Sequence, residues 1–152
     1  MIEKKNFYIN GKWVSPSKPN NFEVIDPSAE EPFAIISLGS IEDTDKAISA
    51  AKNAFETWRE SSKEKRLSLL EKFDQIYNRR WDEMVKAQST EMGAPLDYAS
   101  ETHTKVGADI SKNTIKILKD FNFEHQFDSK SNNYIRYEPI GVCGLITPWN
   151  FP

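Results

Sequence analysis

The sequence has 152 residues with 20 basic and 23 acidic side chains, which give a formal net charge of −3. This balance excludes the strongly basic surface that nucleic-acid binding requires, and no apolar run has the length of a membrane span or a signal peptide. For the second reason we expect a cytoplasmic protein, and the single cysteine, which excludes an intramolecular disulfide, is compatible with that compartment. A mean hydropathy of −0.63 is low enough to indicate a piece of something larger.

The first part of the chain predicts short strands. Residues 7–14 place apolar side chains on both sides of Asn10-Gly11, a pair that favours a tight hairpin turn because both residues tolerate positive φ. Residues 22–25 and 33–38 are the next strand candidates, and prolines between them interrupt a continuous ladder. We expect an exposed hairpin and a small, peripheral antiparallel sheet.

Helical periodicity begins after these strands. Ser40 and Asp43 have the spacing of a capping box, and residues 47–58 then carry apolar side chains at helical intervals. Ser61 and Glu64 repeat the capping signal ahead of a second amphipathic stripe. These patterns predict two consecutive helices.

Two further helices are predicted in the next segment. The pair Arg79-Arg80 is expected to mark a break, after which residues 81–92 form a helix that Gly93 closes. Another helix is predicted over residues 96–121, with a looser apolar pattern and Gly107 in its middle. Beyond it the chain is polar, and residues 134–137 alternate as a strand does.

The chain ends in the stretch Y-E-P-I-G-V-C-G-L-I-T-P-W-N-F-P, residues 137–152. Residues 140–146 are apolar apart from two glycines, which is typical of a strand buried on both faces of a parallel sheet. Pro148 then forces a rigid turn that carries the amide of Asn150. Because ligands bind at the carboxyl ends of such strands, Asn150 is the leading candidate for a functional side chain.

These residues resemble the signature of the NAD(P)-dependent aldehyde dehydrogenase superfamily. The resemblance is carried by E-P-I-G-V at 138–142 and I-T-P-W-N-F-P at 146–152. Further stretches agree with the family in order along the chain: Y-I-N-G-K-W at 8–13, I-D-P at 25–27 and E-M-G-A-P at 91–95. The family's chains are much longer, so this chain resembles an amino-terminal fragment that stops just inside the signature.

The resemblance implies an α/β fold, in which the chain supplies the amino-terminal part of a doubly wound cofactor-binding domain with peripheral strands. Residues 1–121 would form the strands and helices of that part, and residues 122–139 a projecting hairpin that joins subunits. Residues 140–152 would form the first buried strand and an active-site loop. The implied assembly is a homodimer or homotetramer.

The resemblance also implies the oxidation of a small-molecule aldehyde to a carboxylic acid with NAD or NADP, of which NAD is favoured. A cysteine and a glutamate outside this chain would be the nucleophile and the general base, so the chain alone is expected to be inactive. Ile146, Thr147, Pro148 and Trp149 would line the nicotinamide end of the cofactor cleft, together with Asn150.

Asn150 has a clear chemical rationale for a catalytic role. Cysteine attack on an aldehyde places negative charge on the former carbonyl oxygen, and a neutral amide donor stabilises that charge without titrating. The simpler interpretation is a turn residue that bonds only its own backbone. The surrounding motif favours the catalytic role.

Other residues that attract attention have ordinary structural explanations. Cys143 lies in the apolar run with no Lys, Arg or His within six residues, so we expect an inert, buried thiol. His103 and His125 have no partner at ligand spacing, which argues against a metal site and predicts solvated side chains. Trp58 and Trp81 are expected to face the core.

A second class of function remains open. The chain could be a naturally short, non-catalytic protein that associates with full-length subunits through an edge strand at Tyr134. The coding sequence beyond Pro152 distinguishes the two, because a clipped enzyme continues into a cysteine in a glycine-rich stretch, with a glutamate before it.

Overall fold

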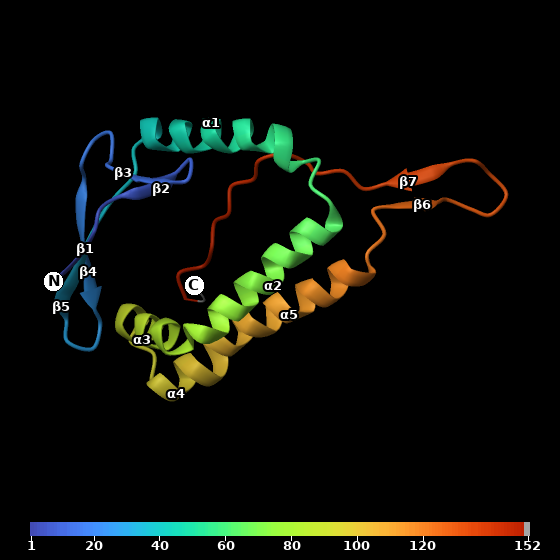
Figure 1. The fold of residues 1–152 in the computed structure, drawn as a ribbon. Coiled ribbons are helices and arrows are strands. Elements are labelled where there is room, and N and C mark those ends of the chain that lie inside the picture. The colour runs from blue at the N-terminus through green and yellow to red at the C-terminus, as the bar shows by residue number, and fades with distance from the viewer. Residues whose placement is uncertain (151–152) are drawn as a thin grey trace.

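The structure is a computed structural model and describes residues 1–150. Strands lie at one end of the molecule and helices form the rest of the body, from which a hairpin projects (Figure 1). The amino-terminal strands are β1 Ile2–Lys4, β2 Phe7–Ile9, β3 Lys12–Val14, β4 Asn21–Asp26 and β5 Glu31–Ser37.

The hairpin of β2 and β3 confirms the prediction from Asn10-Gly11. Both turn residues have positive φ, 52° at Asn10 and 74° at Gly11, and the strands pair antiparallel. Tyr8 lies opposite Trp13, and their rings meet edge to face with centroids 5.2 Å apart. The turn chemistry therefore sets the register of the hairpin.

A three-stranded sheet has the order β1-β5-β4. The antiparallel pair of β4 and β5 was predicted, and its register shifts between Val24 and Ile25, where Ile25 faces Pro32. Proline offers no N–H to the ladder, which explains the irregularity. Strand β1 runs parallel to β5 and was not predicted, because its three exposed residues are too few to show a period.

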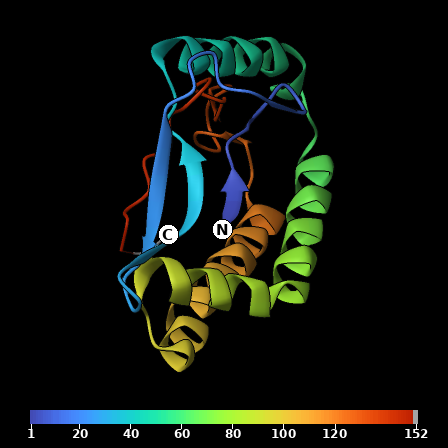
Figure 2. The same ribbon diagram turned by 90° about the vertical axis from the view of Figure 1, so that its left-hand side faces the viewer.

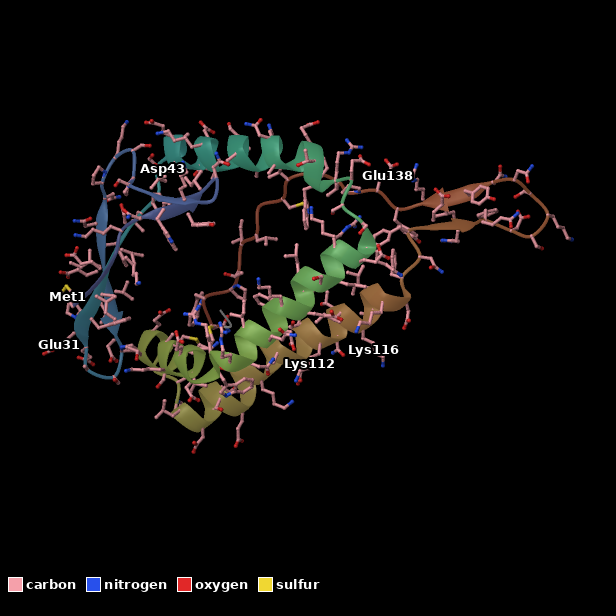
Figure 3. All side chains as sticks on the ribbon, in the orientation of Figure 1. Met1, Glu31, Asp43, Lys112, Lys116 and Glu138 are labelled. Carbon is pink, nitrogen blue, oxygen red and sulfur yellow. The ribbon has the colours of Figure 1, made fainter. Side chains whose placement is uncertain are left out.

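Helix α1, Ile41–Trp58, begins at the predicted capping box. The Asp43 amide donates to the Ser40 hydroxyl oxygen at 3.3 Å, while Asp43 Oδ2 accepts from the Ser40 amide at 2.9 Å and hydroxyl at 2.7 Å. Asp43 Oδ1 also accepts from the amide and hydroxyl of Ser17, each at 2.8 Å. Asp43, labelled in Figure 3, thus ties the start of α1 to the loop after β3.

We expect Asp43→Asn to loosen this loop. The amides of Ser40 and Ser17, together with their hydroxyls, hold the pKa of Asp43 well below its usual range. A depressed folded-state pKa stabilises the fold above the unfolded value of about 3.9 and loses that effect as pH falls below it. Hydrogen exchange should therefore show weaker protection of the Ser17 and Ser40 amides in Asp43→Asn at neutral pH, and a shrinking difference between variant and wild type below about pH 4. Equal protection of these two amides in Asp43→Asn and in the wild type at neutral pH would contradict the role of Asp43 in holding the loop.

Helix α2, Lys63–Arg79, begins one residue later than predicted. The capping side chain is Ser62, whose hydroxyl accepts from the Lys65 amide at 3.2 Å. Ser61 instead donates its amide to the Trp58 carbonyl at 2.9 Å, so it belongs to the turn that leaves α1. Two adjacent serines give the same capping pattern, and only the turn geometry separates them.

The predicted break and the third helix are confirmed. Helix α3, Trp81–Met92, follows Arg80, and Gly93 ends it in a left-handed conformation with φ 71°. A Cβ at Gly93 would lie 2.8 Å from Cγ of Pro27. Glycine is therefore required here both by its conformation and by the close approach of the loop after β4.

The long helix predicted over residues 96–121 is interrupted. It consists of α4 Leu96–Tyr98, the π-helical segment η1 Ala99–Thr104 and α5 Lys105–Asp120. The Tyr77 hydroxyl donates to the Thr104 carbonyl at 3.1 Å and occupies the space where a side chain at Gly107 would begin. The widened π turn and the missing side chain together admit Tyr77 from α2.

The interior between these helices is small and partly polar. Thr104 is fully buried and donates to Gln88 Oε1 at 3.0 Å, and the Trp81 indole donates to the Ser100 hydroxyl at 3.0 Å. His103 is only 7% exposed, so the prediction of a solvated side chain is wrong for it, although His125 is exposed. The apolar residues that are buried in the described chain are all alanines: Ala34, Ala99 and Ala108.

The chain exposes an unusually large surface to solvent. The chain exposes 11894 Å², whereas a compact monomer of 17.5 kDa exposes roughly 7,900 Å² by the usual scaling with mass. Trp58, predicted to face the core, is 44% exposed. Figures 1 and 2 show one reason, because α1 lies apart from α2 and α5. The amphipathic faces are thus present but largely uncovered.

The projecting hairpin consists of β6 Glu124–Gln126 and β7 Tyr134–Arg136, which pair antiparallel. The strand predicted over residues 134–137 is confirmed. Among the described residues, these strands pair only with each other. Figure 1 shows the hairpin extending away from the helices.

The strand predicted over residues 140–146 does not form. This segment is irregular and open to solvent: Ile140 is 94% exposed, Leu145 89% and Ile146 100%. A parallel strand is stable only when neighbouring strands satisfy its backbone groups, and no strand among the described residues pairs with this segment. For the same reason Cys143 is exposed, and its predicted burial is wrong for this chain.

These exposed side chains predict self-association of the isolated chain. An apolar segment with unpaired backbone groups offers both a face and an edge to another copy. We expect sedimentation velocity to show concentration-dependent association, and Ile146→Lys with Leu145→Lys to reduce it. Ile41→Lys, at a residue that is 83% exposed on α1, is the matched control. A monodisperse monomer with a sharp two-state melt would contradict this expectation.

Candidate active-site segment

The predicted site residues follow the projecting hairpin. After β7 the chain passes Glu138, labelled in Figure 3 where the hairpin meets the body, and turns back toward the helices. In the view of Figure 1 it then runs past α1 and continues between α1 and α2. Figure 2 shows it passing to one side of the strands. Most side chains along this path are exposed.

The site residues lie consecutively near the end of this path. Ile146, Thr147, Pro148, Trp149 and Asn150 are all exposed, and a turn begins at Trp149. The side chain of Trp149 is 86% exposed. The turn predicted after Pro148 is therefore present, although the buried strand that was expected to lead into it is absent. Phe151 and Pro152, which complete the motif, lie outside the described residues.

The chemistry of this segment is neutral and apolar. Between Glu138 and Asn150 the only titratable side chain is that of Cys143. Its thiol lies 3.8 Å from the Gly141 carbonyl oxygen. The amide of Asn150 is the one side chain here that combines N–H donors with an acceptor. The segment can therefore contribute neutral hydrogen bonds and apolar contacts, but no general base.

The five site residues lie together only because they are consecutive in the sequence. Among the described residues, no side chain from another element forms a hydrogen bond or ion pair with residues 146–150. No group of His, Cys, Asp or Glu in residues 1–150 is arranged to hold a metal ion. No helix in that part has the length and apolarity that crossing a bilayer requires. A complete active site needs groups that these residues do not supply.

Sequence reasoning missed the contacts that hold the base of the hairpin. Lys63 and Arg66 both reach from α2 to the hairpin end of the molecule. The available signal was their position at the start of an amphipathic helix, which did not identify their partners. Such contacts join segments far apart in the sequence.

Comparison with known proteins identifies the family. The profile of the Aldehyde dehydrogenase family matches residues 13–152. The chain is 41% identical over 153 residues to a 3-succinoylsemialdehyde-pyridine dehydrogenase of a Pseudomonas species, a match that covers 100% of this chain and 31% of that protein.

Solved structures agree with this result. An aldehyde dehydrogenase from Bartonella henselae is 47% identical, with a TM-score of 0.84 over 87% of this chain and 28% of that one. A mutant of aldehyde dehydrogenase C from Pseudomonas syringae, in complex with NAD+ and octanal, is 34% identical. Its TM-score is 0.93 over 97% of this chain and 30% of that one.

The chain thus spans about a third of the length of the relatives that it matches. Its mixed α/β structure corresponds to part of their fold, which explains why amphipathic faces and the segment after the hairpin lie uncovered. Because the family profile covers nearly all of the sequence, the signature and the architecture lead to one conclusion: the chain belongs to the aldehyde dehydrogenase family.

Proposed function

We propose that this chain is the amino-terminal part of an enzyme that oxidises an aldehyde to a carboxylic acid with NAD(P), NAD being favoured. The main support is the Pseudomonas syringae relative, which matches 97% of the chain and was solved with NAD+ and octanal. Here "full-length protein" means a protein of the relatives' length that carries this chain. Its nucleophilic cysteine and its general base would lie outside residues 1–152.

The residues of the site fit the nicotinamide end of the cofactor. Ile146 and Trp149 present fully or mostly exposed apolar side chains, and no charged residue lies between them. The oxidised nicotinamide is a flat aromatic amide whose ring carries a positive charge, and a wall with an aromatic ring and no cationic side chain suits it. The glycines of Gly141-Val142-Cys143-Gly144 do not fit the pyrophosphate, because the third glycine of a dinucleotide loop is absent and no helix follows. When bound, NAD(P) would accept the hydride.

Asn150 would act on the substrate oxygen. After cysteine attack, the former carbonyl oxygen carries negative charge, and the Asn150 amide would donate a hydrogen bond to it. Thr147 and Pro148 would fix the backbone that carries this amide, because proline restricts both its own φ and the residue before it. The thioester that follows hydride loss would be hydrolysed by groups outside this chain.

The remaining parts of the chain would have structural roles. Residues 1–121 would belong to the cofactor-binding domain, and residues 122–139 would be a hairpin that joins subunits into a homodimer or homotetramer. Residues 140–152 would form a buried strand and the active-site loop once the rest of the sheet is present. The projecting, self-paired β6 and β7 support the role of the hairpin.

The direct test is to express the longest reading frame that contains this chain and to assay it with a panel of aldehydes. We expect aldehyde-dependent NADH formation that a thiol-alkylating reagent abolishes. A folded full-length protein that reduces neither NAD nor NADP with any aldehyde of the panel would refute the proposal. A reading frame that stops at Pro152 would favour the non-catalytic alternative.

A further inference from the structure

We propose that Lys63 and Arg66, on the first turn of α2, are positioning residues that fix the direction of the β6–β7 hairpin and so control association with a second copy of the protein. The inference rests on the proposed role of the hairpin in joining subunits. It assigns the control of that role to two cations that lie outside both the hairpin and the active-site segment.

Lys63 holds the end of the helix that leads into the hairpin. Its ammonium group donates to the Lys119 carbonyl oxygen at 2.8 Å and lies 3.4 Å from that of Phe121. These carbonyls lie at the carboxyl end of α5, where the helix leaves its last acceptors unpaired and carries partial negative charge. Lys63 thus fixes the point at which the chain leaves the body.

Arg66 holds the first residues of the hairpin base. Its guanidinium carbon lies 4.9 Å from the ring centroid of Phe123, a cation–π geometry. Two of its nitrogens donate to the Ser61 carbonyl oxygen, Nε at 3.1 Å and Nη2 at 2.6 Å. The planar group is therefore held from one side by the turn between α1 and α2 while Phe123 lies against it. No carboxylate of the described residues pairs with it within 4.0 Å.

The aromatic residues at the base transmit this position to both strands. Phe121 meets Phe123 with ring centroids 4.9 Å apart and Tyr137 with centroids 5.3 Å apart. The Tyr137 amide donates to the Phe123 carbonyl at 2.8 Å, which closes the base of the hairpin. Fixing Phe121 and Phe123 therefore fixes the outgoing and the returning strand together.

Apart from these contacts, the ion pair of Lys119 with Glu71, 2.9 Å between Nζ and Oε1, ties the end of α5 to α2. A two-stranded hairpin alone is only marginally stable in water, and β6 and β7 have no other strand partner among the described residues. The junction also borders a pocket of about 310 Å³ that is open to solvent on one side, and Arg59, Arg66, Arg136 and Tyr137 help to line it. The base is thus not a close-packed core. Its angle depends on a few directional contacts, of which those of Lys63 and Arg66 come from the body.

The test uses Arg66→Met in the full-length protein, because methionine keeps an unbranched apolar stem and removes the donors and the charge. Loss of the cation–π contact and two charged hydrogen bonds in each subunit should raise the dissociation constant of the assembly by about tenfold or more. Dilution series in sedimentation velocity would measure it. Circular dichroism and the thermal midpoint of the dissociated subunit should stay near wild type. Lys63→Met should act in the same direction.

Arg79→Met is the matched control, since Arg79 is an exposed arginine at the other end of α2, and it should not change association. Replacing residues 124–136 by a short Gly-Ser linker separates the possible failures. If the linker variant dissociates while folded Arg66→Met associates as wild type, the positioning role is refuted and the hairpin's role survives. If the linker variant remains assembled, the proposed role of the hairpin fails, and the inference fails with it.

Should Arg66→Met not fold, Arg66→Lys is the deciding variant, because it retains the charge but loses the planar guanidinium group. Wild-type association of folded Arg66→Lys would then refute the role.

Discussion

The 152-residue chain alone should form no NADH or NADPH from any aldehyde. Its site residues supply one neutral amide, the hydroxyl of Thr147, the indole of Trp149 and two apolar side chains, and the only thiol is that of Cys143. That thiol lies in an exposed segment, and no Lys, Arg or His that could act with it lies within six residues in the sequence. Without a nucleophile, a general base and the second wall of the cleft, none of the chemical steps can proceed at an enzymatic rate.

The measurement is a steady-state assay of NADH absorbance with the purified chain, and the full-length protein is the positive control. A preparation from cells that carry an empty vector controls for host dehydrogenases. Turnover above that background would contradict the prediction. If Cys143→Ala then abolished the turnover, Cys143 would have to be regarded as a nucleophile.

The elements that were predicted correctly are those that a few neighbouring residues determine. Asn10-Gly11 sets a hairpin turn, Ser40 with Asp43 starts α1, and Gly93 ends α3. Each of these signals satisfies backbone groups within one turn of the chain. Local chemistry is therefore sufficient for their prediction.

The errors concern residues whose environment comes from elsewhere. The apolar composition of residues 140–146 predicted burial, but burial requires neighbouring strands, and in this chain the segment lies exposed. The exposure of Cys143 follows from the same cause. Trp58 has the periodicity of a core residue, and nothing in residues 1–150 covers it beyond partial burial. Hydrophobic periodicity predicts which face of a helix is apolar, but it does not predict which part of the protein packs against that face.

The π-helical segment shows a different limit. Gly107 was noted as a weakness in a long helix, and the structure gives its reason, since Tyr77 of α2 occupies the space beside it. The partner lies far away in the sequence, so no local pattern could name it. His103 became buried in the same region, because the π turn directs its part of the helix toward α3 and Tyr98.

The candidate site was predictable only as a motif. Ile146 to Asn150 were selected by their resemblance to a family signature, and Pro148 does produce the expected turn. In the part of the chain that the structure describes, no hydrogen bond to another side chain fixes the geometry around Asn150. Its role therefore remains a prediction, and it has a sharp experimental test.

In the full-length protein, Asn150→Ala should lower kcat by roughly a hundred- to a thousand-fold, equivalent to about 2.7 to 4 kcal/mol of transition-state stabilisation. The reason is the loss of a hydrogen-bond donor to the oxygen that becomes negative after cysteine attack. Affinity for the cofactor should change much less. Pre-steady-state measurement of NADH formation would show whether the slowed step precedes hydride transfer.

A structural asparagine would behave differently. Its loss would lower the melting temperature, while the folded fraction would keep its activity. Both quantities should be measured on one sample of Asn150→Ala. Asn53→Ala is the matched control, because Asn53 is an exposed asparagine on α1 and should leave kcat unchanged.

Asn150→Asp separates the hydrogen bond from the shape of the side chain. Aspartate is nearly isosteric with asparagine, but when ionised it offers no donor and repels the developing oxyanion. We therefore expect Asn150→Asp to lower kcat at neutral pH at least as much as Asn150→Ala does. The size of the side chain predicts the opposite order, because aspartate preserves packing that alanine loses. Near-normal kcat in Asn150→Asp, with an unchanged rate-limiting step, would require Asn150 to be removed from the oxyanion site.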